Sequence, residues 1–138
     1  SSFLFDFFTF LFDFFTFLFV FDLLFFVEGS FYQYLPQKNF VFMWEKNGKK
    51  IVDRISEWLS VDFEDKIVVI PIFVPIRKML FFGEYGYREA MIDYGRVLSE
   101  ITHSVSDAKI IRRFETRAMN EKFRLDSVEK SILSIISC

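Results

Sequence analysis

The chain has 138 residues, enough for one domain or for one domain with an appendage. Apolar residues make up 52% and charged residues 26%, which is sufficient for a hydrophobic core and excludes wholesale disorder. The formal net charge of −2 argues against a dedicated nucleic-acid binder. One Cys and one His exclude a disulfide scaffold, a four-cysteine zinc site and the usual zinc hydrolase sites.

The first 27 residues are rich in phenylalanine and contain a tandem repeat. They hold 13 of the 22 Phe, and FLFDFFT occurs twice, at 3–9 and at 10–16. A period of seven is close to two helical turns, so a helix would carry its polar residues on one narrow stripe. The rest of that helix, apart from Asp22, would be apolar. The polar stripe consists of Asp6, Thr9, Asp13 and Thr16.

The segment 3–27 is long enough to cross a bilayer as a helix. At about 1.5 Å per residue it would reach roughly 37 Å, against a hydrocarbon core of about 30 Å. Asp13 lies near its middle, where a carboxylate costs roughly 2.5–3.5 kcal/mol, so the polar stripe needs a partner or, in another interpretation, relays protons. We therefore predict a transmembrane helix over 1–27. Burial in a protein assembly without lipid, or placement on a membrane or capsid surface, are the alternatives.

The residues after this segment fit the membrane interpretation. Phe31, Tyr32 and Tyr34 form an aromatic cluster at the expected interface, and the first basic residue, Lys38, comes after them. By the positive-inside rule the C-terminal side would face the cytoplasm or a mitochondrial matrix. We expect an integral membrane protein, in the mitochondrial inner membrane with its C-terminal side in the matrix.

The region 28–83 is expected to contain an interfacial loop and short elements. Alternating apolar residues predict a strand over 39–45, and apolar spacing predicts a helix over 49–59. The apolar run 66–76 is broken by two prolines, which predicts an edge strand or an extended segment.

The region 84–138 is expected to be helical. Apolar residues at helical spacing predict a helix over 85–103, and capping patterns predict a second over 105–124 and a last one from Asp126 onward. The fold class expected is thus mainly α: one N-terminal transmembrane helix and a small α-rich body with a short β or extended element.

The strongest charged feature is a stripe of basic residues on the predicted helix 105–124. They could contact lipid head groups, an acidic partner or RNA, although an ordinary solvated face is the simpler interpretation. His103 and Cys138 lack the companions that a metal or catalytic site needs. We expect no catalytic residue, no cofactor and no metal. The basic set consists of Lys109, Arg113, Arg117 and Arg124.

These patterns favour a role without catalysis. The sequence predicts an accessory subunit of a large multi-subunit membrane complex, such as a mitochondrial respiratory or ATP-synthase-type assembly, that packs against and stabilises its neighbours. The alternatives are a structural or minor capsid protein of a virus, and a peripheral interaction domain whose basic helix contacts lipid or RNA. The expected partners are other protein subunits and the lipid bilayer, not nucleic acid.

Overall fold

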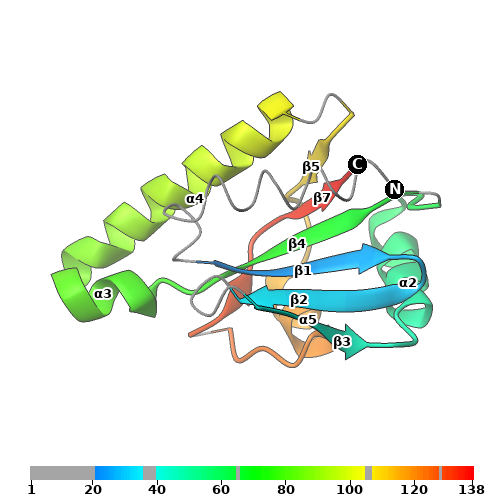
Figure 1. Cartoon of the computed structure of the whole chain (residues 1–138), viewed down its shortest axis with the longest axis horizontal. Coiled ribbons are helices and arrows are strands. Elements are labelled where there is room, and N and C mark those ends of the chain that lie inside the picture. Colours follow the sequence, from blue (N-terminus) through cyan, green and yellow to red (C-terminus); the bar gives the residue numbers. More distant parts are fainter. Residues whose placement is uncertain (1–20, 36–39, 65, 105–106, 128) are drawn as a thin grey trace.

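Figure 1 shows the computed structural model, which describes residues 21–35, 40–64, 66–104, 107–127 and 129–138. Within these residues seven strands form one antiparallel sheet, with the order β3-β2-β1-β4-β7-β5 and β6 beside β4. The strands are β1 (Phe21–Val27), β2 (Ser30–Leu35), β3 (Phe40–Glu45), β4 (Val68–Phe73), β5 (Lys109–Ile111), β6 (Ser131–Ile132) and β7 (Ile135–Ser137). The helices are α2 (Lys49–Leu59), α3 (Ile76–Phe82), α4 (Glu84–Ser104) and α5 (Thr116–Lys122).

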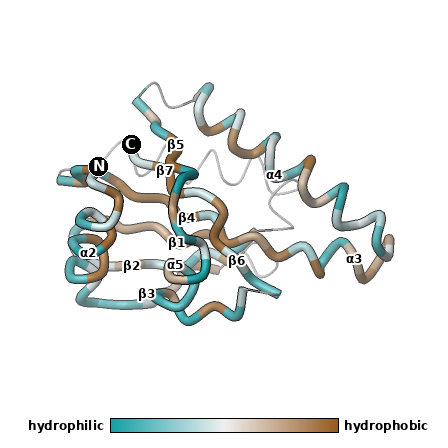
Figure 2. Tube along the Cα trace, turned by 180° about the vertical axis from the view of Figure 1, so that it is seen from behind, coloured by the Kyte–Doolittle hydropathy of each residue, from teal (hydrophilic) through white to brown (hydrophobic). Residues whose placement is uncertain are grey.

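The sheet is covered on both faces, which gives three layers (Figure 1). On one face α4 packs Ala90, Val97 and Ile101 against β1 and β4. On the other face α2 and α5 pack against the opposite sides of the same two strands. Figure 2 shows that the apolar residues concentrate along these central strands. The fold is therefore a mixed α/β sandwich, and the prediction of a mainly α fold is wrong.

The C-terminal part of the predicted transmembrane helix is a central strand. Residues 21–27 form β1, which pairs with β2 on one side and with β4 on the other. Its side chains alternate between the two covered faces, so Leu23 and Leu24 are both buried although they point in opposite directions. A strand buried on both faces has a continuous apolar sequence, as a membrane helix does. The polar stripe Asp6, Thr9, Asp13 and Thr16 lies outside the described residues.

No helix in the described ranges combines the length and the apolar character that crossing a bilayer requires. The predicted transmembrane helix over 1–27 included residues 21–27, which form the strand β1 instead. The predicted placement in a membrane, and with it the predicted role as a subunit of a membrane complex, is therefore wrong. The aromatic residues that we assigned to an interface lie in β2, where Phe31 and Tyr34 are buried in the two cores. The turn between β1 and β2 has two residues, Glu28 and Gly29, with φ of 52° and 85°, as a tight hairpin requires.

The proline-interrupted run is an interior strand, not an edge. β4 lies between β1 and β7, and Pro71 is opposite Leu23 of β1. On the other side of β4, the pairing with β7 ends at Val69 and the pairing with β6 begins at Ile72. Pro71, which has no backbone N–H to donate, lies in the gap between these two ladders.

The C-terminal region agrees with the predictions only in part. The helices predicted over 49–59 and 85–103 are confirmed as α2 and α4. The helix predicted over 105–124 is wrong, because this stretch contains β5, a loop and the short helix α5. The last predicted helix is also wrong, since its apolar residues lie in and between the strands β6 and β7. Most of them are isoleucine, whose β-branched side chain favours strands.

A buried ion pair fixes the place where α3 and α4 leave the sheet. Asp22 of β1 has no exposed surface, and its Oδ1 lies 2.7 Å from an Arg77 guanidinium nitrogen in the first turn of α3. Arg77 also donates a hydrogen bond to the Phe21 carbonyl, at 3.1 Å. Lys130 approaches the other carboxylate oxygen of Asp22, at 3.4 Å.

The helices α3 and α4 form a tightly packed hairpin. Lys78 of α3 binds Asp93 of α4 through an ion pair of 2.6 Å in which both side chains are largely covered. Gly86 faces the backbone of α3, and a Cβ atom there would lie 2.6 Å from the Lys78 carbonyl oxygen. The close approach of the two helices therefore requires glycine at position 86.

Removal of the buried charge should destabilise the whole domain. Asp22→Asn removes the negative charge that pairs with the covered Arg77 guanidinium, which we expect to lower the free energy of unfolding by about 3–5 kcal/mol. Urea denaturation followed by circular dichroism measures this. The matched control is Glu121→Gln, which removes an exposed ion pair with Arg117 of 3.6 Å and should leave the midpoint unchanged. Equal effects of the two variants would contradict the role of Asp22.

Two alanine substitutions on one helix should act in opposite directions. Gly86→Ala must push α3 away from α4, and we expect a loss of about 1–3 kcal/mol in unfolding free energy. Gly95→Ala has no atom within 4 Å of the new Cβ and gains helix propensity, so it should stabilise the isolated chain by up to about 1 kcal/mol. Thermal unfolding of the two variants under identical conditions measures both effects. A stabilised Gly86→Ala variant would show that the hairpin is not tightly packed at this point.

Candidate protein-binding surface on the hairpin of α3 and α4

Large apolar side chains are exposed where the hairpin turns. Leu80, Phe81 and Phe82 end α3 with 76%, 74% and 57% of their surface exposed. Tyr85 and Ile92, on the outer side of α4, are also exposed. These five residues are called the hairpin surface below. Soluble chains rarely leave so many neighbouring large apolar side chains in water unless something binds to them.

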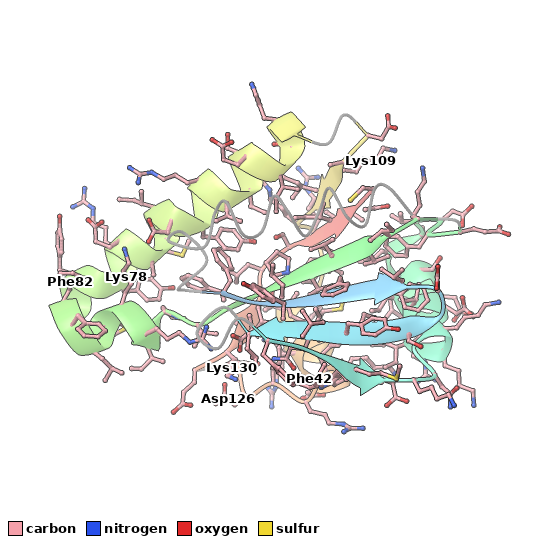
Figure 3. The ribbon with its side chains drawn as sticks, viewed as in Figure 1. Phe42, Lys78, Phe82, Lys109, Asp126 and Lys130 are labelled. Atoms are coloured by element: carbon pink, nitrogen blue, oxygen red, sulfur yellow. The ribbon has the colours of Figure 1, made fainter. Side chains whose placement is uncertain are left out.

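The helical repeat explains why this surface points outward. Tyr85 and Ile92 are seven residues apart, so they lie on the same side of α4, opposite the side that carries Ala90 and Ile101 into the core. The end of α3 projects beyond the sheet, and Phe82 lies at the end of the hairpin farthest from it (Figure 3). The ion pair between Lys78 and Asp93 holds the two helices together beneath the exposed residues.

The charges around the hairpin surface are balanced. Glu84, Arg88, Glu89 and Arg96 all lie on the outer half of α4, two of each sign. Such a mixture gives no field that would select anions or cations. An apolar centre with a rim of both signs is the arrangement found in interfaces between proteins.

An open groove lies elsewhere on the described structure. It has a volume of about 770 Å³ and lies between the β1–β2 turn, α2 and the loop that follows α2. Its apolar floor includes Phe26 and Val52, and Asp53 and Lys66 are among the charged residues at its edge. Over the described ranges, no three His, Cys, Asp or Glu side chains are grouped so that they could hold a metal ion.

The structure does not place the predicted basic residues on one helix. Lys109 is on β5, Arg113 is in the loop after it, Arg117 is on α5 and Arg124 follows α5. Figure 3 shows Lys109 far from Phe82 and on another part of the molecule. Arg117 forms an ion pair with Glu121, one helical turn later, at 3.6 Å, and both side chains are well exposed. Arg124 lies 5.6 Å from the centre of the Trp44 ring, a cation–π contact that the sequence did not indicate.

Buried hydroxyl and thiol groups are held in their neutral forms. Burial raises the pKa of Tyr94, while its hydrogen bond with Ser134 and the positive charge of Arg112 act in the opposite direction. Burial also raises the pKa of Tyr34. The pKa of the Cys138 thiol is raised to about 11 by burial, against a smaller opposing effect of Lys66. A thiol that stays protonated at neutral pH is a poor nucleophile.

Sequence reasoning missed the hairpin surface. The helix α3 was not predicted, because residues 76–82 follow directly on the apolar run and show no polar face. Tyr87 and Met91 belong to the apolar spacing that predicts the helix over 85–103, but both are at least 40% exposed. The available signal was the cluster Leu80-Phe81-Phe82-Gly83, which combines large apolar side chains with a residue that ends a helix.

Comparison with known proteins identifies the fold and not the family. No protein-family model matches the chain, and no curated protein matches it in sequence. A candidate nitroreductase from Anabaena variabilis, solved as a crystal structure at 1.80 Å, is similar in structure with a TM-score of 0.64 and 18% identity. The match covers 86% of this chain and 27% of that one.

A second similar structure belongs to an assembly of several proteins. It is a chain of the microcin synthetase McbBCD complex of E. coli, solved with truncated pro-MccB17 bound. The TM-score is again 0.64, at 12% identity, and the match covers 87% of this chain and 51% of that one. The chain thus spans about a quarter and about half of these two structures. It has a nitroreductase-like fold, and one of its structural neighbours works in contact with other proteins.

Proposed function

We propose that this chain acts by binding another polypeptide, without catalysis of its own, and that the hairpin surface is the contact. The observation that carries the proposal is the exposure of Leu80 and Phe81, each about three-quarters in solvent, on a hairpin built to hold them in place. Exposed apolar side chains on a rigid support can be buried by a partner at little cost in conformational entropy.

The free energies involved indicate that a partner must cover the whole surface. Burying one large apolar side chain completely contributes roughly 1.5–3 kcal/mol. Three of them give at most about 9 kcal/mol, whereas association costs an estimated 4–15 kcal/mol. Including Tyr85 and Ile92 raises the gross gain to at most about 15 kcal/mol. A partner that contacts both the end of α3 and the outer side of α4 is therefore favoured over one that contacts Phe82 alone.

The structural neighbours also favour a role in binding another polypeptide. One of them is a component of a complex with several proteins, and both are longer than the part that this chain matches. In each neighbour, therefore, the matched region is only one part of a longer polypeptide. A unit with this fold and an uncovered apolar surface is suited to assembly with a further polypeptide segment.

Site-specific photocrosslinking tests the proposal. A benzophenone amino acid replaces Phe82 in the full chain, which is produced in the cells that normally make it and then irradiated. We expect a crosslinked product clearly heavier than 16.6 kDa, because the probe lies inside the contact. Mass spectrometry then identifies the attached polypeptide.

Trp58 provides the matched control, because it is an aromatic residue of similar exposure, 49%, on α2. The same probe at position 58 should give little or no product. In addition, Leu80→Ser with Phe81→Ser should reduce the product from position 82 at least fivefold. A yield at position 82 no higher than that at position 58 would contradict the proposed function.

A further inference from the structure

We infer that Asn47 is a chemical modification site: its side-chain amide is lost through a cyclic imide when the contact between Gly48 and the β1–β2 turn opens. The folded chain delays this reaction by keeping the contact closed. The observations behind this inference are the exposed Asn47, the buried Gly48 that follows it, and the hydrogen bond that fixes Gly48. They do not involve the hairpin surface, so the modification site and the proposed function stand or fall separately.

The reaction needs only these two residues and water. The backbone nitrogen of Gly48, once it has given up its proton to a hydroxide ion, attacks the side-chain carbonyl carbon of Asn47. A bond between this nitrogen and Cγ forms, the bond between Cγ and Nδ2 breaks, and the side-chain nitrogen leaves as ammonia. Water then opens the ring at either carbonyl, which leaves aspartate or isoaspartate at position 47. A following glycine makes a labile asparagine more labile, because it has no side chain to obstruct the attack.

The side chain of Asn47 is accessible for this reaction. Asn47 is exposed and lies in the connection between β3 and α2. Its backbone N–H donates to a Glu45 carboxylate oxygen at 3.3 Å, but its side-chain amide makes no hydrogen bond with the described residues. Lys46 and Lys49 are exposed on either side of the pair, and their positive charge favours loss of the Gly48 proton.

The fold restrains Gly48 on both of its peptide groups. Its N–H donates to the Gly29 carbonyl in the β1–β2 turn, at 3.0 Å, and its own carbonyl accepts from the N–H groups of Ile51 and Val52, at 3.1 Å each. Figure 1 shows the β1–β2 turn and α2 at the same end of the sheet. While the N–H is held in this hydrogen bond, the nitrogen cannot turn toward the side chain of Asn47. The turn must first separate from the start of α2, which is a local opening of the fold.

Packing explains why a labile pair of residues is present here. Gly48 is buried, and a Cβ atom at this position would lie 2.7 Å from Cδ2 of Phe31 and 3.2 Å from Cδ2 of Phe26. Any other residue would therefore have to displace aromatic rings of the core. The core thus requires the glycine that makes Asn47 labile, and the hydrogen bond to Gly29 limits the consequence.

Incubation of the full chain at neutral pH tests the inference, with one sample in buffer and one unfolded in guanidinium chloride. Mass spectrometry of the peptide that contains position 47 measures the fraction of Asn47 converted to aspartate and isoaspartate. We expect conversion in buffer to be at least about tenfold slower, because a protected backbone group reacts only when the fold opens locally. Equal rates in the two samples would overturn the inference, and so would an unfolded chain in which Asn47 stays unchanged.

Two glycine variants show whether the turn controls the reaction. Gly29→Ala places a side chain at a φ of 85° in open space, which strains the turn, and should speed conversion in buffer by about fivefold or more. Gly83→Ala is the matched control. The φ of Gly83 is 63° and the space is also open, but this residue ends α3, at the opposite end of the molecule from α2 (Figure 1). It should change the rate by less than about twofold.

Circular dichroism checks that both variants are folded, and in guanidinium chloride all three chains should react at the same rate. Equal acceleration by the two substitutions would show that Asn47 reacts only after the whole domain unfolds. That result would overturn the control of the reaction by the contact between Gly48 and the turn.

Discussion

The charge of Asp22 must be balanced inside the protein, because its carboxylate lies in the central strand and has no contact with solvent. Arg77 provides most of this balance, and Lys130 adds a weaker contact from the other end of the chain. Since Arg77 is in the first turn of α3, the requirement of one buried carboxylate also determines where the hairpin starts. The next residue, Lys78, then fixes α4 through Asp93. The position of the hairpin surface therefore depends on the ion pair between Asp22 of β1 and Arg77 of α3.

Local sequence patterns predicted the helices whose apolar residues recur at helical spacing. The helix over 49–59 and the helix over 85–103 each have one apolar side, and both are present. The central strands could not be distinguished in this way. In β1 and β4 both faces are buried, so their sequences lack alternation and resemble an apolar helix or an interrupted run. The deciding factor is pairing with distant segments, such as β1 with β4, and a single sequence does not display such pairing.

The candidate site was even less accessible to sequence reasoning. Aromatic residues at 81 and 82 indicate burial when considered alone, because apolar side chains are usually found inside. Their exposure depends on α3 projecting beyond the sheet, which in turn depends on Arg77 reaching Asp22 across 55 positions of the chain. The sequence also showed Asp22 only as an exception in an apolar segment. Its importance becomes visible when its partners from α3 and from the loop before β6 are brought beside it.

The pairing of β4 with β7 has a consequence for how the protein is made. Val68 and Val69 of β4 find their partners at Ser137 and Ile136, almost seventy positions later. While a ribosome is still synthesising the intervening chain, one edge of β4 has no neighbour, and its apolar faces are only partly covered. Folds that depend on such distant contacts form slowly and pass through aggregation-prone intermediates. Until β7 has emerged, the edge of β4 that it will occupy therefore stays open to pairing with other strands.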